Sequence, residues 1–387
     1  MHPRRRPGTQ PRLQPWILPA LGVFCVFMIY LNRRAFRYVA PPTAGNLAGS
    51  VRYETKVDPS AHGMISQLDR AHCQSSLQTS PLEAFETSTP LPALNTTAWH
   101  YRLKNLDVMK NTSFVDDAVL LLVVYNNKDS WGKGRSVRDF LQLVESFDYP
   151  THKLSLGLLT SSLEEYILLK RMFQRILLTQ FAEVTITFRD DFNIKIASHA
   201  ARKADNIQKE RRRMLARYRN YALAQSLESW HSHVVWIDSD IVSIPPALVT
   251  KMVHAKLDIL EPLCHLVGST QDYDLNAWLG QRAVPTDDEL AAMHDGTLFV
   301  PHDGPGMLHM NDMRGHEYHP LDSVGGTMLY VKADVHRQGV VFPPHYIIGS
   351  EWKHEGYDGI ETEGVCYVAG MLGYKCYAMP QDIIYHI

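Results

Sequence analysis

The chain has 387 residues, of which 45% are hydrophobic and 21% are charged, values that are ordinary for a globular protein. Its formal net charge is −2 at pH 7, so the sequence lacks the strongly basic character of a nucleic-acid-binding protein. This length accommodates one large domain with accessory segments, or two domains.

The N-terminus is predicted to be a membrane anchor. Residues 13–31 carry no charged side chain, and arginines precede and follow them. The stretch is slightly shorter than the ~20 residues of a typical transmembrane helix, but it is long enough for a thin bilayer. A cleaved signal peptide is the alternative, although no clear small-x-small cleavage site follows. We expect a cytoplasmic tail at 1–12, a signal anchor at 13–31 and, from sequons at Asn95 and Asn111, a luminal remainder.

Residues 32–114 are predicted to form a luminal stem. Pro, Ser, Thr, Ala and Gly are frequent in this segment, and strong hydrophobic periodicity is lacking. Short helices at 77–85 and 99–106 are expected to dock on the catalytic body. We place that body at residues 115–387.

The five cysteines leave the disulfide pattern open. Cys25 lies within the anchor, and the other four can form two disulfides in an oxidising compartment. Cys366 and Cys376 are close enough in sequence to pair, or both are buried thiols. No Cys-x-x-Cys occurs, so we do not expect a structural zinc site.

From residue 118 onward, the hydrophobic pattern predicts alternating strands and helices. Strands are expected at 118–124, 153–159, 184–188, 234–237, 258–264, 325–332 and 374–379, and a final apolar run at 383–387. Helices are expected at 135–147, 163–178, 200–228, from 246 to 254, and at 361–372. Such alternation predicts a doubly wound, largely parallel α/β sheet whose strands end on one rim. Residues 265–320 are irregular, as in a functional lid or binding loop.

The most informative motif follows the strand at 234–237, where Asp238-Ser239-Asp240 comes directly after an apolar run. Open α/β sheets bind their ligands at the edge where parallel strands end. Two carboxylates at that edge suit a divalent cation such as Mn2+ or Mg2+ that itself holds a diphosphate. A solvated turn or a helix cap is the alternative for such a pair. The motif therefore indicates a transferase that uses a sugar nucleotide.

Six stretches occur in the order and spacing of a known family. They are residues 235–241, 273–278, 324–327, 331–337, 360–364 and 385–387. Together they resemble the fungal Anp1/Mnn9/Van1 family of Golgi α-1,6-mannosyltransferases, over roughly residues 118–387. The resemblance implies a GT-A fold with a Rossmann-like, doubly wound mixed sheet.

The resemblance also implies an activity and a location. The expected reaction transfers mannose from GDP-mannose, with Mn2+ as cofactor, to a mannose acceptor of N-glycan mannan, with an α-1,6 link and retained anomeric configuration. The expected protein is a single-pass type II enzyme of the Golgi membrane that has other mannosyltransferase subunits as partners. Ser239 stands where the family has a small Ala, and residues 349–359 are more polar and longer than in the family. The acceptor therefore stays open.

Metal ligands are assigned by the resemblance to Asp238, Asp240 and His386, and Asp238 also to the nucleotide. A neutral imidazole is a reasonable partner for Mn2+. An ordinary exposed histidine near a chain end is the alternative for His386. Five further histidines, at 294, 302, 309, 316 and 319, fit no zinc spacing and are expected to be exposed in a loop.

Three acidic residues are candidates for catalysis. Asp274 is expected near the sugar, where it accepts the acceptor proton or holds donor hydroxyls; an Asx-turn or helix cap is the alternative. Glu361 and Glu363 stand two apart, so one of them faces the site while the other caps the following helix. A retaining transfer needs a nucleophile or a front-face route, and the sequence does not choose between them.

The donor is expected to meet several residues of the rim. Tyr125 and Asn126 follow the first strand, where GT-A folds hold the nucleobase. Arg219 suits bidentate phosphate contacts, although a basic helix is often a solvated face. Gly325 and Gly326 permit close backbone approach, or they simply form a strand-entry turn.

Three rival functions remain. The first is a non-catalytic subunit of a mannan polymerase complex, and the second is a GT-A transferase with another donor such as UDP-galactose. The third is a haloacid-dehalogenase-type phosphatase, which places its Asp-x-Asp after the first strand. Here the motif follows about the fourth strand, which disfavours that reading.

Overall fold

The structure is a computed structural model that describes residues 82–91, 96–175, 181–192, 205–295 and 302–387. These residues belong to one compact unit. The expected tail, the anchor and most of the stem lie outside the described residues. In the part of the chain that is described, no helix combines the length and hydropathy needed to span a bilayer.

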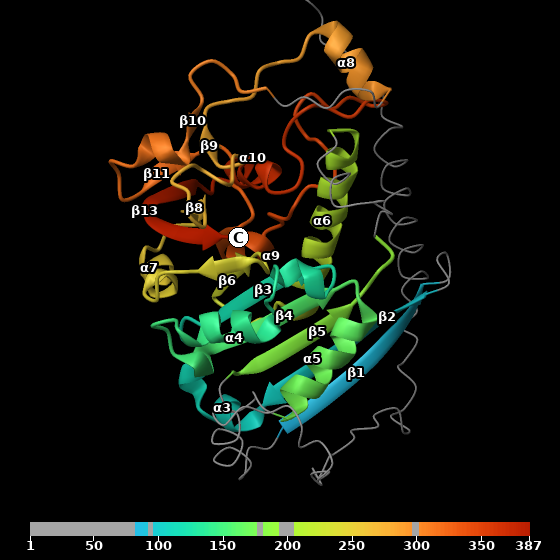
Figure 1. Cartoon of the computed structure of the whole chain (residues 1–387), viewed down its shortest axis with the longest axis vertical. Coiled ribbons are helices and arrows are strands. Elements are labelled where there is room, and N and C mark those ends of the chain that lie inside the picture. The colour runs from blue at the N-terminus through green and yellow to red at the C-terminus, as the bar shows by residue number, and fades with distance from the viewer. Residues whose placement is uncertain (1–81, 92–95, 176–180, 193–204, 296–301) are drawn as a thin grey trace, which may run out of the picture. The chain divides into compact units, whose positions relative to one another are not determined.

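A mixed β-sheet of eleven strands, counted over the described residues, organises the fold (Figure 1). The strands run in the spatial order β1-β2-β5-β4-β3-β6-β12-β8-β13-β11, and β7 pairs with β13. In chain order they are β1 (Leu82–Leu91), β2 (Thr96–Asn105), β3 (Val119–Tyr125), β4 (Leu154–Thr160), β5 (Glu183–Phe188), β6 (His233–Ile237), β7 (Ile241–Ser243), β8 (Ile259–Leu266), β11 (His319–Leu321), β12 (Met328–Lys332) and β13 (Cys376–His386).

The centre of the sheet is parallel, as the alternating pattern predicted. Strands β5, β4, β3 and β6 pair in parallel, and so do β8 and β13. Strand β12 runs antiparallel between β6 and β8. Because β12 starts beside the end of β6, the carboxyl ends of β3, β6, β8 and β13 and the entry to β12 share one rim. The mixed α/β sheet is thus confirmed.

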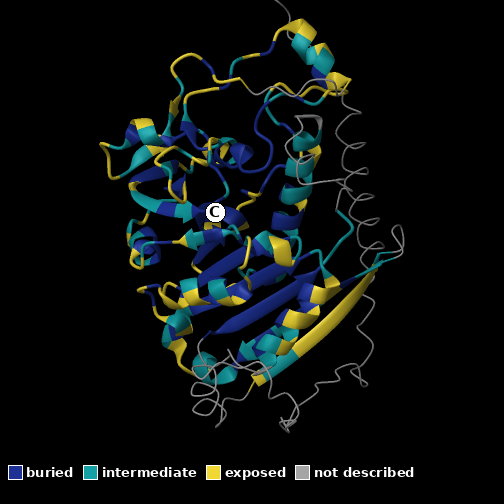
Figure 2. Cartoon of the chain, viewed as in Figure 1, coloured by how far each residue is buried: buried dark blue, intermediate teal, exposed yellow. Residues whose placement is uncertain are grey.

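The prediction of two short helices before residue 115 is wrong. Residues 82–91 and 96–105 are strands, and β2 pairs antiparallel with β5 at the edge of the main sheet. In β2 every second residue from Tyr101 to Asn105 is buried, the period-two pattern of a strand, and Ala98 is buried on the opposite side. The sheet therefore begins inside the segment that we had assigned to the stem. Figure 2 shows β1 as an exposed edge beside buried strands.

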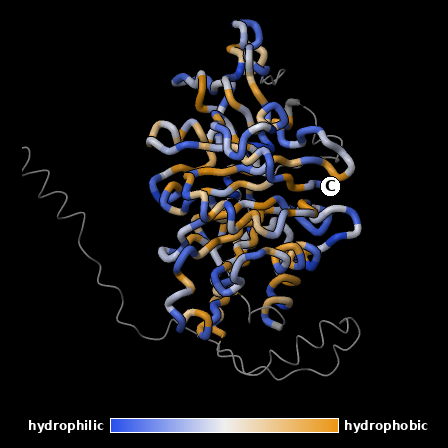
Figure 3. The backbone as a smooth tube through the Cα atoms, turned by 90° about the vertical axis from the view of Figure 1, so that its left-hand side faces the viewer, coloured by the Kyte–Doolittle hydropathy of each residue, from blue (hydrophilic) through white to orange (hydrophobic). Residues whose placement is uncertain are grey.

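Helices cover both faces of the sheet and define two cores. One core joins alternate strand residues such as Leu121 and Val123 to helices α4 (Val137–Glu145), α5 (Leu163–Arg175) and α7 (Leu248–His254). The other joins Leu120 and Leu122 to helices α6 (Asp205–Ser226), α9 (Ala333–Arg337) and α10 (Glu363–Met371). In Figure 3 the hydrophobic stretches accordingly run through the middle of the fold.

The segment expected to be irregular contains small elements among its described residues. Strands β9 (Trp278–Leu279) and β10 (Leu308–His309) form a separate two-stranded ribbon. Helix α8 (Asp287–His294) begins with a capping box made by Thr286 and Glu289. A further short helix, α3 (Leu106–Lys110), follows β2.

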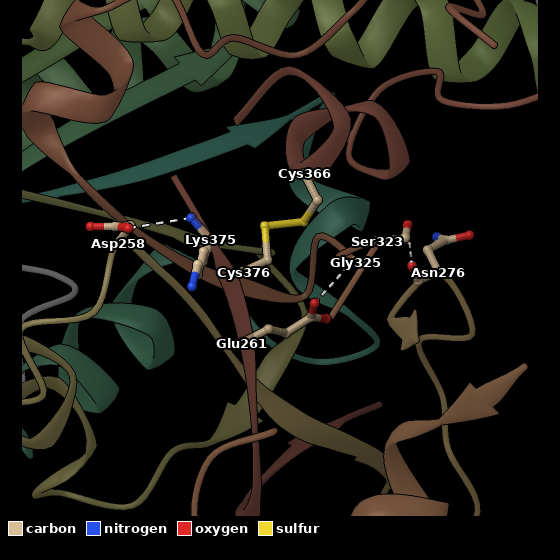
Figure 4. Close-up of a disulfide and its surroundings, with 8 residues drawn as sticks. All are labelled: Asp258, Glu261, Asn276, Ser323, Gly325, Cys366, Lys375 and Cys376. Carbon is tan, nitrogen blue, oxygen red and sulfur yellow. Dashed lines mark hydrogen bonds between the residues drawn. A yellow bond between two sulfur atoms is a disulfide. The ribbon is translucent and has the colours of Figure 1, made fainter. Parts of the chain in front are cut away.

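A disulfide joins Cys366 of α10 to Cys376, the first residue of β13 (Figure 4). The two Cα atoms are 6.0 Å apart. Cys264 is a buried free thiol, and Cys25 and Cys73 lie outside the described residues. The two strands expected at 374–379 and 383–387 are one strand, with a register shift between Met379 and Ile383.

Strand β6, which leads into the Asp-Ser-Asp motif, is braced by a buried histidine. Trp236 Nε1 donates to His336 Nε2 at 3.2 Å, and His336 Nδ1 bonds the Val340 carbonyl oxygen at 2.6 Å. A carbonyl only accepts, so Nδ1 carries the hydrogen and the ring is neutral. Burial lowers the pKa of His336 to about 4.

This bracing predicts a pH dependence of stability. An unfolded histidine has a pKa of roughly 6.5, so between pH 7 and pH 5 the unfolded chain takes up a proton that folded His336 does not. The free energy of unfolding therefore falls as the pH falls through this window. For His336→Gln, which cannot titrate, we expect a decrease smaller by about 2 kcal/mol, measured by urea unfolding at both pH values. Equal decreases in parent and variant would contradict the assignment.

Candidate functional site

The rim of the sheet brings together side chains from widely separated parts of the sequence. Arg219 comes from α6, Asp238 and Asp240 follow β6, and His386 ends β13. Asp274 reaches the Gly325-Gly326 turn before β12 from the loop after β8. Most of the predicted site residues therefore meet at the edge where a parallel sheet binds ligands.

Arg219 is the buried cation of this site. Its side chain contacts Glu361, reaches Asp238 Oδ1 at 3.2 Å and donates to the Gly326 carbonyl oxygen at 3.3 Å. Burial alone would lower the pKa of Arg219, but Glu361, Asp238 and Asp274 raise it above the ordinary value. Arg219 is thus not a solvated residue of a basic helix, because it links α6 to three parts of the rim.

The Asp-Ser-Asp segment is held by its backbone and by the central serine. The Asp238 N–H donates to the Thr327 carbonyl oxygen at 2.9 Å, which ties the end of β6 to β12. The buried Ser239 hydroxyl donates to the Ser130 carbonyl oxygen at 2.7 Å, a bond that an alanine would lack. The two carboxylates remain partly exposed, with 37% of the Asp238 side chain and 34% of the Asp240 side chain accessible.

Asp240 and His386 form a direct pair. His386 Nε2 lies 3.1 Å from Asp240 Oδ1, and Nδ1 lies 2.7 Å from the Ile387 carbonyl oxygen. The Ile387 backbone oxygen only accepts, so Nδ1 carries a hydrogen, and Nε2 donates to Asp240 when the ring is also protonated at that nitrogen. Burial opposes protonation, but the hydrogen bond and the charge of Asp240 raise the pKa of His386. His386 is therefore part of the site rather than an exposed residue near a chain end.

Negative charge is in excess around Asp238. Burial by surrounding protein atoms, together with Asp240 and Asp274, raises the pKa of Asp238 to about 6, although Arg219 and His386 act in the opposite direction. A cation placed among these carboxylates would relieve their mutual repulsion. The electrostatics of the rim thus favour the binding of positive charge.

Asp274 holds the turn that leads into β12. Its Oδ2 accepts from the backbone N–H of Gly326 at 2.8 Å and of Thr327 at 3.2 Å. Its Oδ1 accepts from Asn276 N at 3.3 Å, which is the Asx-turn considered as an alternative. Asp274 can form the Asx-turn and hold the turn before β12 at the same time, because Oδ1 serves the first and Oδ2 the second.

The two glycines of this turn make room for site side chains. A Cβ on Gly325 would collide with the Asp274 carboxylate, and a Cβ on Gly326 would lie 2.5 Å from Arg219 Nη2. Close approach is thus required at both glycines, where the approaching groups are the side chains of Asp274 and Arg219, and contact of this turn with the donor stays a prediction.

Glu261 and Tyr273 belong to this site but were not singled out from the sequence. Glu261 Oε2 accepts from Gly325 N at 2.7 Å, and the carboxyl is fully buried, which raises its pKa well above the ordinary value (Figure 4). The Tyr273 ring stacks on His386 with centroids 4.0 Å apart. A glutamate inside the apolar strand pattern at 258–264 was the available signal for Glu261.

Glu361 and Glu363 lie in different surroundings. Glu361 faces Arg219 and has a φ of 60°, a left-handed conformation that is strained for a non-glycine residue. Glu363 is completely buried between Arg212 and Arg282, each at 2.8 Å. Neither side chain caps α10. The geometry therefore associates Glu361, and not Glu363, with the acidic rim.

The expected nucleobase residues are only partly available. Tyr125 is 5% exposed, donates to Glu165 at 3.2 Å and packs on Trp131 with centroids 4.5 Å apart. Tyr125 is therefore a core residue, and its ring is not open to a ligand at the rim. Asn126 lies at the rim, where its Oδ1 accepts from Ser161 at 2.6 Å. Of the loop histidines, those at 294, 302 and 316 are exposed and those at 309 and 319 are half-buried.

A fully formed metal cage is not present among the described residues, since no three His, Cys, Asp or Glu side chains converge closely enough. The chemistry of the donors nevertheless suits a divalent cation. Asp240 and His386 are already in contact, Asp238 is two residues away, and the surplus of carboxylate charge is the condition that such an ion relieves.

Comparison with known proteins agrees with the motifs. A family model described as Anp1 matches residues 97–346. The chain is 31% identical over 260 residues to the Schizosaccharomyces pombe protein named mannan polymerase complex subunit mnn9, which covers 62% of this chain and 73% of that protein. It is 27% identical over 311 residues to the Candida albicans protein named mannan polymerase complex subunit MNN9, with 74% and 79% coverage.

Among solved structures, the mannosyltransferase PcManGT from Pyrobaculum calidifontis, in complex with GDP-Man and Mn2+, matches with a TM-score of 0.39 and 10% identity. That match covers 73% of this chain and 63% of the other. The family match begins inside β2, in accord with the early start of the sheet, and it ends before Glu361 and His386. The place of these two residues in the site therefore rests on their contacts with Arg219 and Asp240.

The crowding at Gly326 predicts the effect of a single methyl group. In Gly326→Ala the guanidinium of Arg219 must leave its place, which weakens its contacts with Glu361 and Asp238. We expect the free energy of unfolding to fall by about 2 kcal/mol, measured by urea denaturation. Gly370→Ala is the control, because that helical position has nothing within 4 Å of the new methyl group. Equal stabilities of the two variants would refute the close contact at Gly326.

Proposed function

Because the chain belongs to the Anp1 family, we propose that it is a glycosyltransferase that transfers mannose from GDP-mannose to a mannose acceptor of N-glycan mannan. The observation that carries this proposal is the pairing of Asp240 with His386 beside Asp238, at the carboxyl end of β6. An acidic pair and an imidazole at this edge match what transfer from a nucleoside diphosphate requires.

In this proposal Mn2+ is the cofactor, held by Asp238, Asp240 and His386. The bound ion would supply Lewis-acid neutralisation of the departing diphosphate. Other residues of the chain hold these ligands in position. The Nδ1 hydrogen bond to Ile387 holds the imidazole so that Nε2 faces the site, and Arg219 holds Asp238 in position from α6. Asn126 lies at the rim beyond β3, and we propose that it contacts the nucleoside there.

Asp274 and Glu361 are the carboxylates proposed to lie near the reacting sugar. Asp274 is anchored by three backbone N–H groups, so its position does not depend on side-chain rotamers elsewhere. It suits the orientation of a sugar hydroxyl or the acceptance of its proton. Glu361 is bound to Arg219, and its role is to hold that cation at the rim. Glu363, between its two arginines, is assigned to the stability of α10 and its neighbours.

The remaining expectations are kept as parts of the same proposal. We propose a GT-A fold, an α-1,6 linkage with retained configuration, and a type II Golgi membrane topology with a luminal catalytic body. The relatives named as mannan polymerase complex subunits suggest that this chain also has mannosyltransferase subunits as partners.

A non-catalytic subunit is the second candidate function, and the word "subunit" in the names of the relatives favours it. Such a protein would bind GDP-mannose but would not transfer the sugar. The Asp240–His386 pair suits either function, because both bind GDP-mannose, whereas the anchored Asp274 favours catalysis, because binding alone needs no group that accepts a proton beside the sugar.

The acidic pair predicts the outcome of one isosteric substitution. Asp240→Asn keeps the shape of the side chain but removes its charge, so we expect transfer of labelled mannose from GDP-mannose to fall by at least about 100-fold. Chelation of divalent cations should have the same effect on the parent protein. The matched control is Asp334→Asn, because the Asp334 side chain is 83% exposed on α9.

Circular dichroism should show both variants folded, because Asp240 is partly exposed and its backbone contacts are kept. Full activity of folded Asp240→Asn, or of the parent protein without divalent cations, would refute the metal assignment. A parent protein that binds GDP-mannose and never transfers it would instead support the non-catalytic function.

A further inference from the structure

Exposed apolar side chains gather around His386 beside the acidic pair. We call the following five residues the apolar collar: Leu266, Val267, Tyr273, Leu275 and Ile387. They are 38%, 62%, 40%, 56% and 46% exposed, in that order. Exposed apolar side chains that cluster, unlike single ones, mark binding surfaces.

Three of the five collar residues contact His386, and the other two are close in sequence to His386 or to Tyr273. Leu266 pairs with His386 in the parallel β8–β13 ladder, and Val267 N donates to the His386 carbonyl oxygen at 2.9 Å. The Tyr273 ring stacks on the His386 imidazole at an interplanar angle of 27°. Ile387 directly follows His386, and Leu275 lies two residues after Tyr273. Because His386 also contacts Asp240, the collar borders the acidic pair.

The order of the strands places the collar on one side of that pair. Along the rim, Asn126 follows β3, Asp238 and Asp240 follow β6, and the collar follows β8 and β13 beyond β12. A sugar nucleotide whose nucleoside lies near β3 and whose diphosphate lies near β6 therefore has its sugar directed toward β8. The collar lies on that same side of the acidic pair.

We propose that the apolar collar is the acceptor subsite, and that it binds a hexopyranose of the acceptor glycan with one C–H face of the sugar ring against Tyr273. This inference rests on the proposed function. An aromatic ring with carboxylates at its border is the combination that a neutral sugar needs, because its ring faces are apolar and its edge carries hydroxyl groups. Tyr273 then lies between His386 and the acceptor, so the same ring that packs on the imidazole also orients the incoming sugar.

Charge and composition favour a neutral glycan over other occupants. Asp274, which is not one of the proposed metal ligands, lies beside the collar and would repel a phosphate or an anionic lipid there. A stable protein interface needs a larger apolar centre in which charged groups are depleted, whereas here the carboxylates border the apolar residues.

The test compares two leucines of similar exposure. Leu275→Ala removes part of the collar, whereas Leu168→Ala, on α5, removes a side chain that is 49% exposed on a helix away from the rim. Two reactions are measured for each variant: transfer to a series of mannose oligosaccharides, and hydrolysis of GDP-mannose without acceptor. For Leu275→Ala we expect the acceptor KM to rise about fivefold, with donor KM and hydrolysis unchanged. Leu168→Ala should match the parent in every value.

Tyr273 provides a second and stronger comparison. We expect Tyr273→Ala to raise the acceptor KM by at least about tenfold, and Tyr273→Phe, which keeps the ring, to stay within about twofold of the parent. Binding of mannobiose, measured by saturation-transfer NMR in the presence of GDP, should weaken in the same order. Unchanged mannobiose binding and acceptor KM in Tyr273→Ala and Leu275→Ala would overturn the proposal.

Three further outcomes separate the possible failures. If the parent protein neither binds nor hydrolyses GDP-mannose, the proposed function fails, whereas loss of donor hydrolysis in the collar variants alone would assign the collar to the donor. If Leu275→Ala changes the molecular mass in light scattering but not the acceptor KM, the collar is a protein interface and the acceptor proposal is wrong.

Discussion

The site depends on one buried ionic contact, that of Arg219 with Asp238 and Glu361. Arg219 comes from the helix that covers one face of the sheet, Asp238 from the end of a central strand, and Glu361 from the segment before α10. A buried guanidinium without these carboxylates would be costly, and the carboxylates without the guanidinium would repel one another. The same contact accounts for two local features. The strained backbone of Glu361 accompanies the contact of its carboxylate with Arg219, and the missing Cβ of Gly326 leaves room for the Arg219 guanidinium.

A second set of contacts, made with the backbone of residues 325–327, connects the acidic rim to the neighbouring loops. Buried Glu261 and anchored Asp274 together bind three consecutive backbone N–H groups, those of Gly325, Gly326 and Thr327. The turn before β12 is thereby held by Glu261 of strand β8 and by Asp274 of the loop that follows β8. Thr327 in turn accepts from the N–H of Asp238. The Asp238–Asp240 segment and the loop that carries Asp274 are therefore linked by hydrogen bonds through this turn, although their residues lie far apart in the sequence.

The sequence predicted the parts of this molecule that are governed by local pattern. The buried parallel strands and their helices were found because apolar runs of that length form few other structures, and Asp238 and Asp240 were found because they end such a run. Strands β1 and β2 were missed, since an exposed edge strand such as β1 has a polar composition like that of a stem. Tyr125 was misplaced because the spacing cannot tell which side of the rim a ring faces. Glu261 and the stacking of Tyr273 depend on contacts across the sheet, which no local pattern reports.

The disulfide between Cys366 and Cys376 has a practical consequence for anyone producing this protein. It ties the last helix to the strand that ends in His386 and the collar, and both sulfur-bearing side chains are almost completely buried. In the cytosol of an ordinary bacterial host the two thiols would stay reduced, so the segment that delivers His386 would be less firmly held. Activities measured on protein from such a host would then be lower than those of the oxidised protein, even when the reduced protein is soluble and folded. Secreted or periplasmic expression is therefore the appropriate source for quantitative work.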